Sequence, residues 1–229
     1  MENNRESFFE NVYTSNFWSG DSSRSGKGSE GNFAHEKVKL IQGIIDKLDI
    51  KSVLDIGCGD LYWMKDVLNT RSINYTGVDV VQKLLDKNKK DHPQYNFEKL
   101  DLNKKYRVDL VIVFDVFGHQ LHHEVIELIN YLNKLDSKYV IVTNRINKHT
   151  KEINFNKHRH EGINTEIYDE WKNKLIFKTP ALYPDDYFCL YETCGGGSVS
   201  EVCSLCGTTN TFVGAKFCPE CGQRIGSIV

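Results

Sequence analysis

Long apolar runs, a secretory signal and an excess of basic charge are all missing from this sequence of 229 residues. No apolar run reaches the length that spans a bilayer, and the opening residues MENNRESFFENVY hold no basic segment followed by an apolar core. Acidic and basic residues nearly balance, 31 against 29, which leaves only local patches for contacts with nucleic acid. We therefore expect a cytoplasmic protein without a membrane partner.

Disulfides are not expected either, because seven cysteines in a chain without a signal point to metal binding in a reducing compartment. Two C-x2-C pairs, each followed by glycine and separated by eleven residues, supply Cys203, Cys206, Cys218 and Cys221. Such twin pairs resemble zinc ribbons, in which four thiolates fill the tetrahedral shell of a structural zinc. A segment this short needs such a metal to fold. We expect a zinc ribbon at 201–229, joined by a linker at 195–200.

Strand-like and helix-like segments alternate between residues 33 and 194. The helical spacing predicts helices at 33–48, 61–68, 81–90 and 122–135, and apolar runs predict strands at 53–56, 75–80, 97–100, 108–117 and 138–144. Strands that are apolar on both faces indicate a parallel sheet covered on both sides. Two last strands, at 174–183 and 186–194, have no long helix between them and favour an antiparallel hairpin. We predict an α/β, Rossmann-like, doubly wound and mostly parallel seven-stranded sheet.

The stretch DIGCGD follows the first expected strand, at the point of such a sheet where ligands bind. Gly57 and Gly59 let the backbone approach a ligand closely. A dinucleotide fingerprint needs a third glycine, but Tyr62 takes its place, and Asp60 stands where the next helix should begin. A carboxylate there caps a helix well but repels a diphosphate. The loop therefore favours a cationic nucleoside without phosphates, such as S-adenosylmethionine, over NAD or ATP.

Two further carboxylates fit a nucleoside. Asp79 closes the second strand, 20 residues after Gly59, where an acidic residue accepts both ribose hydroxyls; the alternative is that it only ends the strand as a turn residue. Asp101 follows the third strand, where it is placed to accept the adenine amino group, with Leu102 beside the ring.

These residues, together with Phe114 and Asp115, resemble the ordered motifs of class I S-adenosylmethionine-dependent methyltransferases, over roughly residues 16–194. Trp18, the segment SRSGKGS at 23–29 and the sequence GDLYWM resemble one group of small bacterial and viral members. The resemblance implies Ser25 and Gly26 near the cofactor's carboxylate and Asp115 near its methionine end. The full set of expected cofactor contacts is Trp18, Ser25, Gly26, Asp55, Gly57, Gly59, Asp60, Asp79, Val80, Asp101, Leu102 and Asp115.

The resemblance also bears on the arm, which we define as residues 1–32. Its composition, ending in SGDSSRSGKGSEGN, is typical of a disordered segment. The resemblance implies instead that the arm folds over the cofactor. The sequence leaves both alternatives open.

Methyl transfer to a hydroxyl needs a general base, and His119 follows the fourth strand at a suitable point, although it could equally pack or cap the next helix. No Asp/Asn-Pro-Pro-Tyr/Phe motif follows that strand and no Pro-Cys nucleophile is present, which argues against methylation of adenine or cytosine in DNA. We expect transfer to an O or N atom of a polar, possibly anionic acceptor, contacted by the basic segment 147–160 unless that segment is only a solvated loop. The alternatives are an RNA or protein methyltransferase targeted by the ribbon, and a non-catalytic assembly module that binds S-adenosylmethionine.

Overall fold

The computed structural model describes residues 2–145, 163–181 and 185–193. They divide into two compact units, the first made of 2–104 and 108–116, the second of 105–107 and the described residues from 117 onward. The strands are β1 (Ser52–Ile56), β2 (Asn74–Asp79), β3 (Asn96–Lys99), β4 (Arg107–Val113), β5 (Asp136–Asn144), β6 (Lys174–Pro180) and β7 (Tyr187–Glu192). They form one mixed sheet in the order β3-β2-β1-β4-β5-β7-β6, so the predicted seven-stranded Rossmann-like sheet is confirmed.

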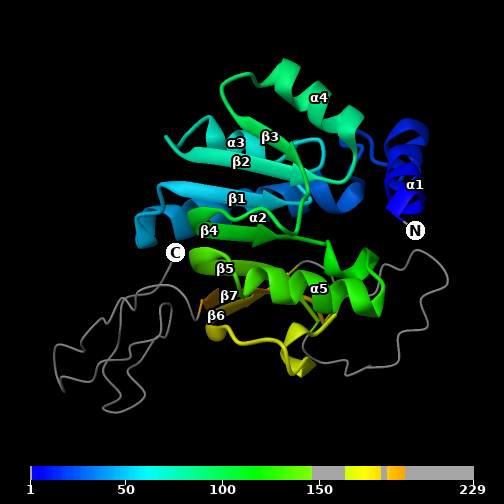
Figure 1. Cartoon of the computed structure of the whole chain (residues 1–229). Helices are drawn as coiled ribbons and strands as arrows, with labels where there is room; N and C mark the ends of the chain where they lie inside the picture. The colour runs from blue at the N-terminus through cyan, green and yellow to red at the C-terminus, as the bar shows by residue number, and fades with distance from the viewer. Residues whose placement is uncertain (1, 146–162, 182–184, 194–229) are drawn as a thin grey trace, which may run out of the picture. The chain divides into compact units, whose positions relative to one another are not determined.

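The first unit contains the parallel part of the sheet, in which β1 pairs with β2 and β4, and β2 pairs with β3. Figure 1 shows β1, β2 and β4 pointing the same way. The helices of this unit are α2 (Gly31–Leu48), α3 (Met64–Leu68) and α4 (Gln82–Asp91). Helix α2 buries one face, formed by Ala34, Lys37, Ile41, Ile44 and Ile45, and α4 packs on β2 and β3. This arrangement places the carboxyl ends of β1, β2 and β4 at one edge of the sheet.

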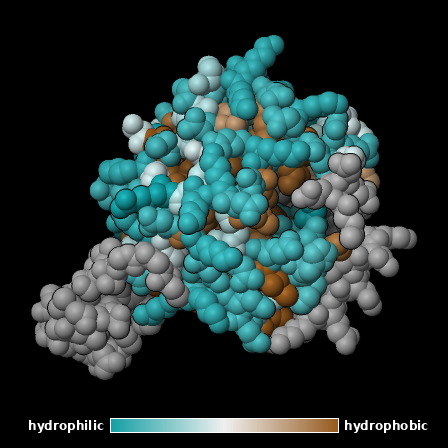
Figure 2. All heavy atoms as spheres, viewed as in Figure 1, coloured by the Kyte–Doolittle hydropathy of each residue, from teal (hydrophilic) through white to brown (hydrophobic). Residues whose placement is uncertain are grey.

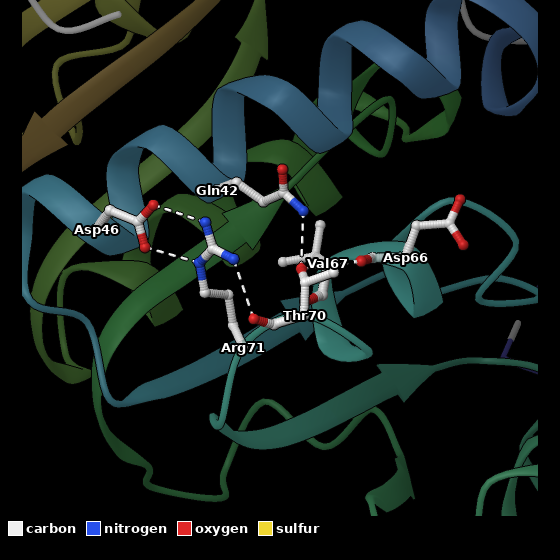
Figure 3. Close-up of polar contacts among 6 residues, drawn as sticks. All are labelled: Gln42, Asp46, Asp66, Val67, Thr70 and Arg71. Atoms are coloured by element: carbon white, nitrogen blue, oxygen red, sulfur yellow. Dashed lines mark hydrogen bonds and ion pairs between the residues drawn. The ribbon is translucent and has the colours of Figure 1, made fainter.

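A polar cluster joins α2 to the end of α3 (Figure 3). Arg71 donates through Nε and Nη2 to the two carboxylate oxygens of Asp46, each at 2.7 Å. Gln42 Nε2 donates to Thr70 Oγ1 at 2.8 Å, and that hydroxyl donates back to the carbonyl of Val67. The C-terminal half of α2 and the end of α3 are therefore fixed to each other.

The arm is folded, so the alternative of a disordered segment is wrong for residues 2–32. It begins with α1 (Glu2–Ser15), whose Val12 is fully buried. Glu6 of α1 accepts from Lys99 Nζ at 2.6 Å, and Glu10 accepts from Lys83. Composition alone was misleading because polar residues of the arm form hydrogen bonds and ion pairs with other residues of the first unit. These contacts hold the arm in a folded position.

The second unit contains α5 (His122–Leu132), β5, β6 and β7, with β7 antiparallel to both β5 and β6. A buried polar cluster lies at the end of β5. Asn144 accepts through Oδ1 from the N–H of Thr165 at 2.7 Å and donates through Nδ2 to the Tyr191 hydroxyl at 2.9 Å. That hydroxyl donates to Glu166 Oε1 at 2.8 Å, and burial is the main cause of its raised pKa. The predicted closing hairpin is confirmed, with Cys189 buried in β7.

Several predicted boundaries need correction. The second predicted helix begins three residues late, at Met64, because residues 60–63 form turns. The fourth strand ends at Val113, and Phe117 begins a 3-10 helix, η2 (Phe117–His119). The fourth predicted helix ends at Leu132, three residues early, since Asp136 already begins β5. The predicted strand at 174–183 ends at Pro180, and 182–183 lie outside the described residues. The other predicted elements agree with the structure to within two residues at each end.

Within the described residues, no helix combines the length and apolarity needed to span a bilayer. The face in Figure 2 is mostly hydrophilic, with smaller hydrophobic patches between the polar residues. Among the described large apolar side chains, those most exposed are Phe17, Leu102 and Leu121.

Candidate functional site

The glycine loop after β1 has a conformation that glycine adopts easily and other residues do not. Gly57 and Gly59 have φ values of 75° and 57°, both in the left-handed region. The N–H groups of Gly57 and Cys58 donate to the carbonyl of Val78 at 2.8 and 3.1 Å, which fastens the loop to the end of β2. A Cβ atom on Gly57 would lie only 2.5 Å from a methyl carbon of Val116. The backbone therefore needs glycine here for both conformation and space.

Asp79 ends β2 as predicted and lies beside this loop. Its Oδ2 accepts from the N–H of Gly59 and its Oδ1 from the N–H of Val81, both at 3.1 Å. Burial raises the pKa of this carboxyl, while the backbone donors oppose that shift. A carboxylate offers about four lone-pair positions, so Asp79 can accept a further donor such as a hydroxyl. Val80, which follows it, is half-buried.

Asp60 binds the arm and does not cap a helix. Helix α3 begins four residues after Asp60, and its N-cap residue, Trp63, makes no side-chain cap. The Asp60 carboxylate accepts from Ser23 Oγ at 3.0 Å, from the N–H of Arg24 at 2.6 Å and from Ser25 Oγ at 3.0 Å. The expected helix cap is therefore wrong, because three donors of the arm take up this carboxylate.

The segment around Ser25 lies directly on the glycine loop. A Cβ atom on Gly59 would stand 2.4 Å from Ser25 Oγ and 3.2 Å from the hydroxyl of Tyr13. Gly26 has φ 87°, and a Cβ atom there would meet the Cβ of Trp18 at 2.7 Å. The Trp18 ring in turn packs edge-on against Tyr13, with centroids 6.4 Å apart. Three elements of the arm thus converge on one face of the loop.

Glu30 organises the same segment from its other end. Its carboxylate accepts from the backbone N–H groups of Asp21, Ser22 and Ser23 at 2.8 to 3.0 Å. These hydrogen bonds lower the pKa of Glu30. The residues 21–23 are therefore wrapped around a carboxylate of the arm itself.

Lys37 and Asp115 form an ion pair at the carboxyl end of β4. Lys37 Nζ lies 2.7 Å from Asp115 Oδ2 and also donates to the carbonyl of Gly28 at 2.9 Å. The ammonium is 5.9 Å from the centroid of the Trp63 ring and 5.8 Å from that of Phe114, and these two rings stack on each other. Lys37 is 4% exposed and Asp115 is 42% exposed. A single ammonium thus links α2, the arm and the end of β4.

Asp55 lies within β1, behind the glycine loop. Burial raises its pKa to about 7, although the Tyr75 hydroxyl, which donates to its Oδ2 at 2.8 Å, opposes that shift. The negative charge of Asp79 raises the value and the positive charge of Lys37 lowers it. The side chain is 3% exposed, so its geometry suits a structural support of the loop better than a ligand contact.

Asp101 and Leu102 follow β3 and are exposed. Asp101 Oδ1 accepts from the N–H of Asn103 at 2.8 Å, which closes a turn and leaves Oδ2 for another donor. Leu102 is 38% exposed, so its side chain is accessible to a ligand. Both positions are compatible with a contact to a planar base.

His119, the predicted general base, lies in η2 of the second unit and is half-buried. In the same unit His122, expected to be a surface residue, is exposed, and its Nδ1 lies 3.4 Å from the hydroxyl of Tyr168. The four predicted zinc ligands Cys203, Cys206, Cys218 and Cys221 lie outside the described residues, as does the basic segment 147–160. The zinc ribbon and the role of this segment stay predictions.

Two charged residues of the site were missed in the sequence. Lys37 could have been found, since it occupies the apolar face of α2 between Ala34 and Ile41, where a lysine needs a specific partner. Glu30 had no comparable signal, because three backbone donors on an irregular loop leave no periodic pattern.

No protein-family profile and no curated protein sequence matches the chain. Solved structures match in fold. The methyltransferase domain of bacterial CtHen1-C has a TM-score of 0.54 at 16% identity, over 69% of this chain and 96% of that chain. Magnesium protoporphyrin IX methyltransferase (ChlM) from Synechocystis PCC 6803 with bound SAH has a TM-score of 0.57 at 14% identity, over 82% and 94%. The 16S rRNA methylase ArmA has 0.51 at 12%, over 71% and 85%. These similarities establish that the chain shares the Rossmann-like fold of these proteins.

Proposed function

We propose that the chain is an S-adenosylmethionine-dependent methyltransferase that transfers a methyl group to an O or N atom of a polar acceptor. The observation that carries this proposal is the set of carboxylates around the glycine loop. Asp79 adjoins Gly59 directly, and Asp60 stands next along the chain, with no helix beginning before Met64. A diphosphate is stabilised by an open helix N-terminus, which the loop does not present.

The donors and acceptors present fit the proposed cofactor. Asp79 retains acceptor capacity for ribose hydroxyls, and Asp101 retains Oδ2 for the adenine amino group. Asp115 stands at the end of β4, where a carboxylate stabilises a cationic ligand. Trp18, Ser25 and Gly26 belong to the part of the arm that lies on the loop. Asp55 supports the loop from within β1 through its hydrogen bond with Tyr75, and Val80 follows Asp79 at a half-buried position beside the proposed ribose site.

When bound, S-adenosylmethionine supplies the activated methyl group. The task of the chain is to orient the acceptor, to exclude water and to remove a proton from a hydroxyl acceptor. We assign the last role to His119, because histidine is the residue type that most often transfers protons in catalysis near neutral pH. The known acceptors of the similar folds range from a porphyrin to ribosomal RNA, so the fold does not select one.

We also propose that the residues 201–229 form a zinc ribbon that recruits the acceptor or a protein partner. The support is the spacing of the two C-x2-C pairs. Four thiolates occupy every tetrahedral position, so the metal would have no catalytic role. Metal analysis should find one zinc per chain, lost when Cys203 and Cys206 become serine; a chain that purifies without zinc would refute this part.

Calorimetry with S-adenosylmethionine and, separately, NAD tests the cofactor assignment. We expect the methyl donor to bind and NAD to bind far more weakly. Asp79→Ala should weaken binding about a hundredfold, because ribose hydroxyls lose a charged acceptor, whereas exposed Asp86→Ala should leave it unchanged. Tighter binding of NAD would overturn the proposal. Incubating cell extract with methyl-labelled cofactor and fractionating the products would identify the acceptor, and no transfer despite tight binding would favour the assembly module.

A further inference from the structure

A lysine that is 4% exposed is unusual, because an ammonium taken out of water needs compensating partners. Lys37 has two strong ones, the carboxylate of Asp115 and the carbonyl of Gly28. An ammonium carries three protons, and these two contacts use two of them. Among the described residues no acceptor takes the third proton, and the ammonium lies over the Trp63 and Phe114 rings.

The two ends of the ion pair differ in their access to solvent. The side chain of Asp115 is 42% exposed. Its backbone has a left-handed φ of 57° just after the end of β4. Its carboxylate can therefore attract a ligand cation without being uncovered first. A ligand cation drawn to Asp115 would weaken the hold of Asp115 on Lys37. The buried ammonium would then need a second negative charge, which the ligand itself has to bring.

A zwitterionic α-amino acid group satisfies both requirements at once, since its ammonium matches Asp115 and its carboxylate matches Lys37. We propose that Lys37 binds the α-carboxylate of the cofactor while it keeps its hydrogen bond to the carbonyl of Gly28. The same ammonium would then both recognise the amino-acid end of the cofactor and hold the arm on the glycine loop. This inference rests on the proposed function, because it assigns one end of the same cofactor. An adenosine without that end brings neither charge to the pair.

Three ligands that differ at this end test the inference on the unaltered protein. S-adenosylmethionine carries both charges, decarboxylated S-adenosylmethionine lacks only the carboxylate, and 5′-methylthioadenosine lacks the whole amino-acid end. In calorimetry we expect loss of the carboxylate to weaken binding about tenfold to hundredfold, as is typical of a lost charge-assisted hydrogen bond. Equal affinity for the first two ligands would overturn the inference. Failure of all three to bind would instead refute the proposed cofactor.

Variants of Lys37, compared with the same three ligands, test whether this residue is the one that binds the carboxylate. Lys37→Met should bind S-adenosylmethionine and its decarboxylated form with nearly equal affinity, while it binds 5′-methylthioadenosine as the unaltered protein does. Lys39→Met, on the exposed side of the same helix, should keep the full preference for the carboxylate. A Lys37→Met protein that keeps this preference would refute the assignment. Should that variant not fold, Lys37→Gln and the ligand comparison above carry the test.

Protease cleavage reads out the link to the arm. S-adenosylmethionine should slow cleavage within residues 20–29 by about tenfold more than decarboxylated S-adenosylmethionine does, because only the former engages the ammonium that holds Gly28. The difference between the two ligands should vanish in Lys37→Met. Equal protection by both saturating ligands in the unaltered protein would show that the arm closes without Lys37.

Discussion

The two units both contain buried polar networks, but they build them from different chemical groups. In the first unit the charged side chains of Asp60, Asp79, Glu30 and Lys37 bind backbone groups, serine hydroxyls and one carboxylate, so charges hold the loops in place. In the second unit the network centres on two neutral groups, the amide of Asn144 and the hydroxyl of Tyr191, and has one carboxylate, Glu166, at its end. Charges respond to pH and to charged ligands, whereas a neutral amide does neither. The amide at the centre of the second network should therefore respond less to pH than the carboxylates that hold the loops of the first unit.

The largest loss of stability is expected from removing the hydrogen bonds of Asn144. Asn144→Ala leaves the N–H of Thr165 buried without its acceptor and removes a donor from Tyr191, which should lower the free energy of unfolding by about 4 kcal/mol. Urea unfolding should show the same loss at pH 5 and pH 8. Asn130→Ala, at a half-exposed position of α5, is the control. A loss that changes with pH would show that the charge of Glu166, and not the amide of Asn144, dominates this network.

The next prediction concerns how the stability of the protein depends on pH through the buried carboxyl of Asp55. A carboxyl whose folded pKa is raised stabilises the fold below its unfolded pKa, near 3.9, and loses that contribution as pH rises through its folded value, here about 7. Between pH 4 and pH 8 the unaltered protein should therefore lose up to about 4 kcal/mol more stability than Asp55→Asn, whose amide still accepts from Tyr75. Exposed Asp49→Asn is the control. Parallel pH profiles for the unaltered protein and Asp55→Asn would contradict the raised pKa.

A smaller effect is expected from loosening the arm. Ser25→Ala removes the hydrogen bonds to Asp60 and Tyr13 and should cost about 1 kcal/mol. Protease cleavage within 20–29 should become several times faster, because local opening of the arm is then easier. Ser22→Ala, at an exposed position, should leave the rate unchanged. Unchanged cleavage in Ser25→Ala would show that Asp60 alone holds this segment.

The smallest effect concerns the surface pair between α2 and the end of α3. Arg71→Met removes both hydrogen bonds to Asp46, yet these side chains are partly exposed, so we expect a loss of only about 0.5 kcal/mol. Arg71→Lys should recover part of it, since the charge remains but the two-pronged geometry does not. Added salt should reduce the difference between the unaltered protein and Arg71→Met. A loss above 2 kcal/mol would contradict this prediction, because it would mean that this partly exposed pair stabilises the fold as much as a buried hydrogen-bond network does.

Much of the fold was readable from the sequence, because buried parallel strands are continuous apolar runs. The segment VLDI and the helix at 33–48 show their burial in their spacing, and the structure agrees with both to within two residues. Helix α1 was missed because its residues have little amphipathic pattern, and its position depends on Glu6 and Glu10 meeting lysines some 70 to 90 residues away. No local pattern in the sequence reports such a pairing.

The site was predicted less evenly than the fold. Gly57, Gly59 and Asp79 could be found because a turn after a buried strand restricts both residue type and spacing. The bonding of Asp60 was misjudged, since its donors Ser23, Arg24 and Ser25 come from a segment whose composition is typical of disorder. A carboxylate binds the nearest suitable donors, and only the folded chain shows which ones those are.

The contact of Ser25 with Gly59 has a consequence for how this protein can change over evolutionary time. Any side chain at Gly59 would collide with the Ser25 hydroxyl and approach Tyr13, so a mutation in the loop requires compensating mutations in the arm. The glycine motif cannot drift toward another nucleotide specificity by itself. In related chains, glycine at position 59 and the arm residue in contact with it should therefore be conserved together. Chains that lack one should also lack the other.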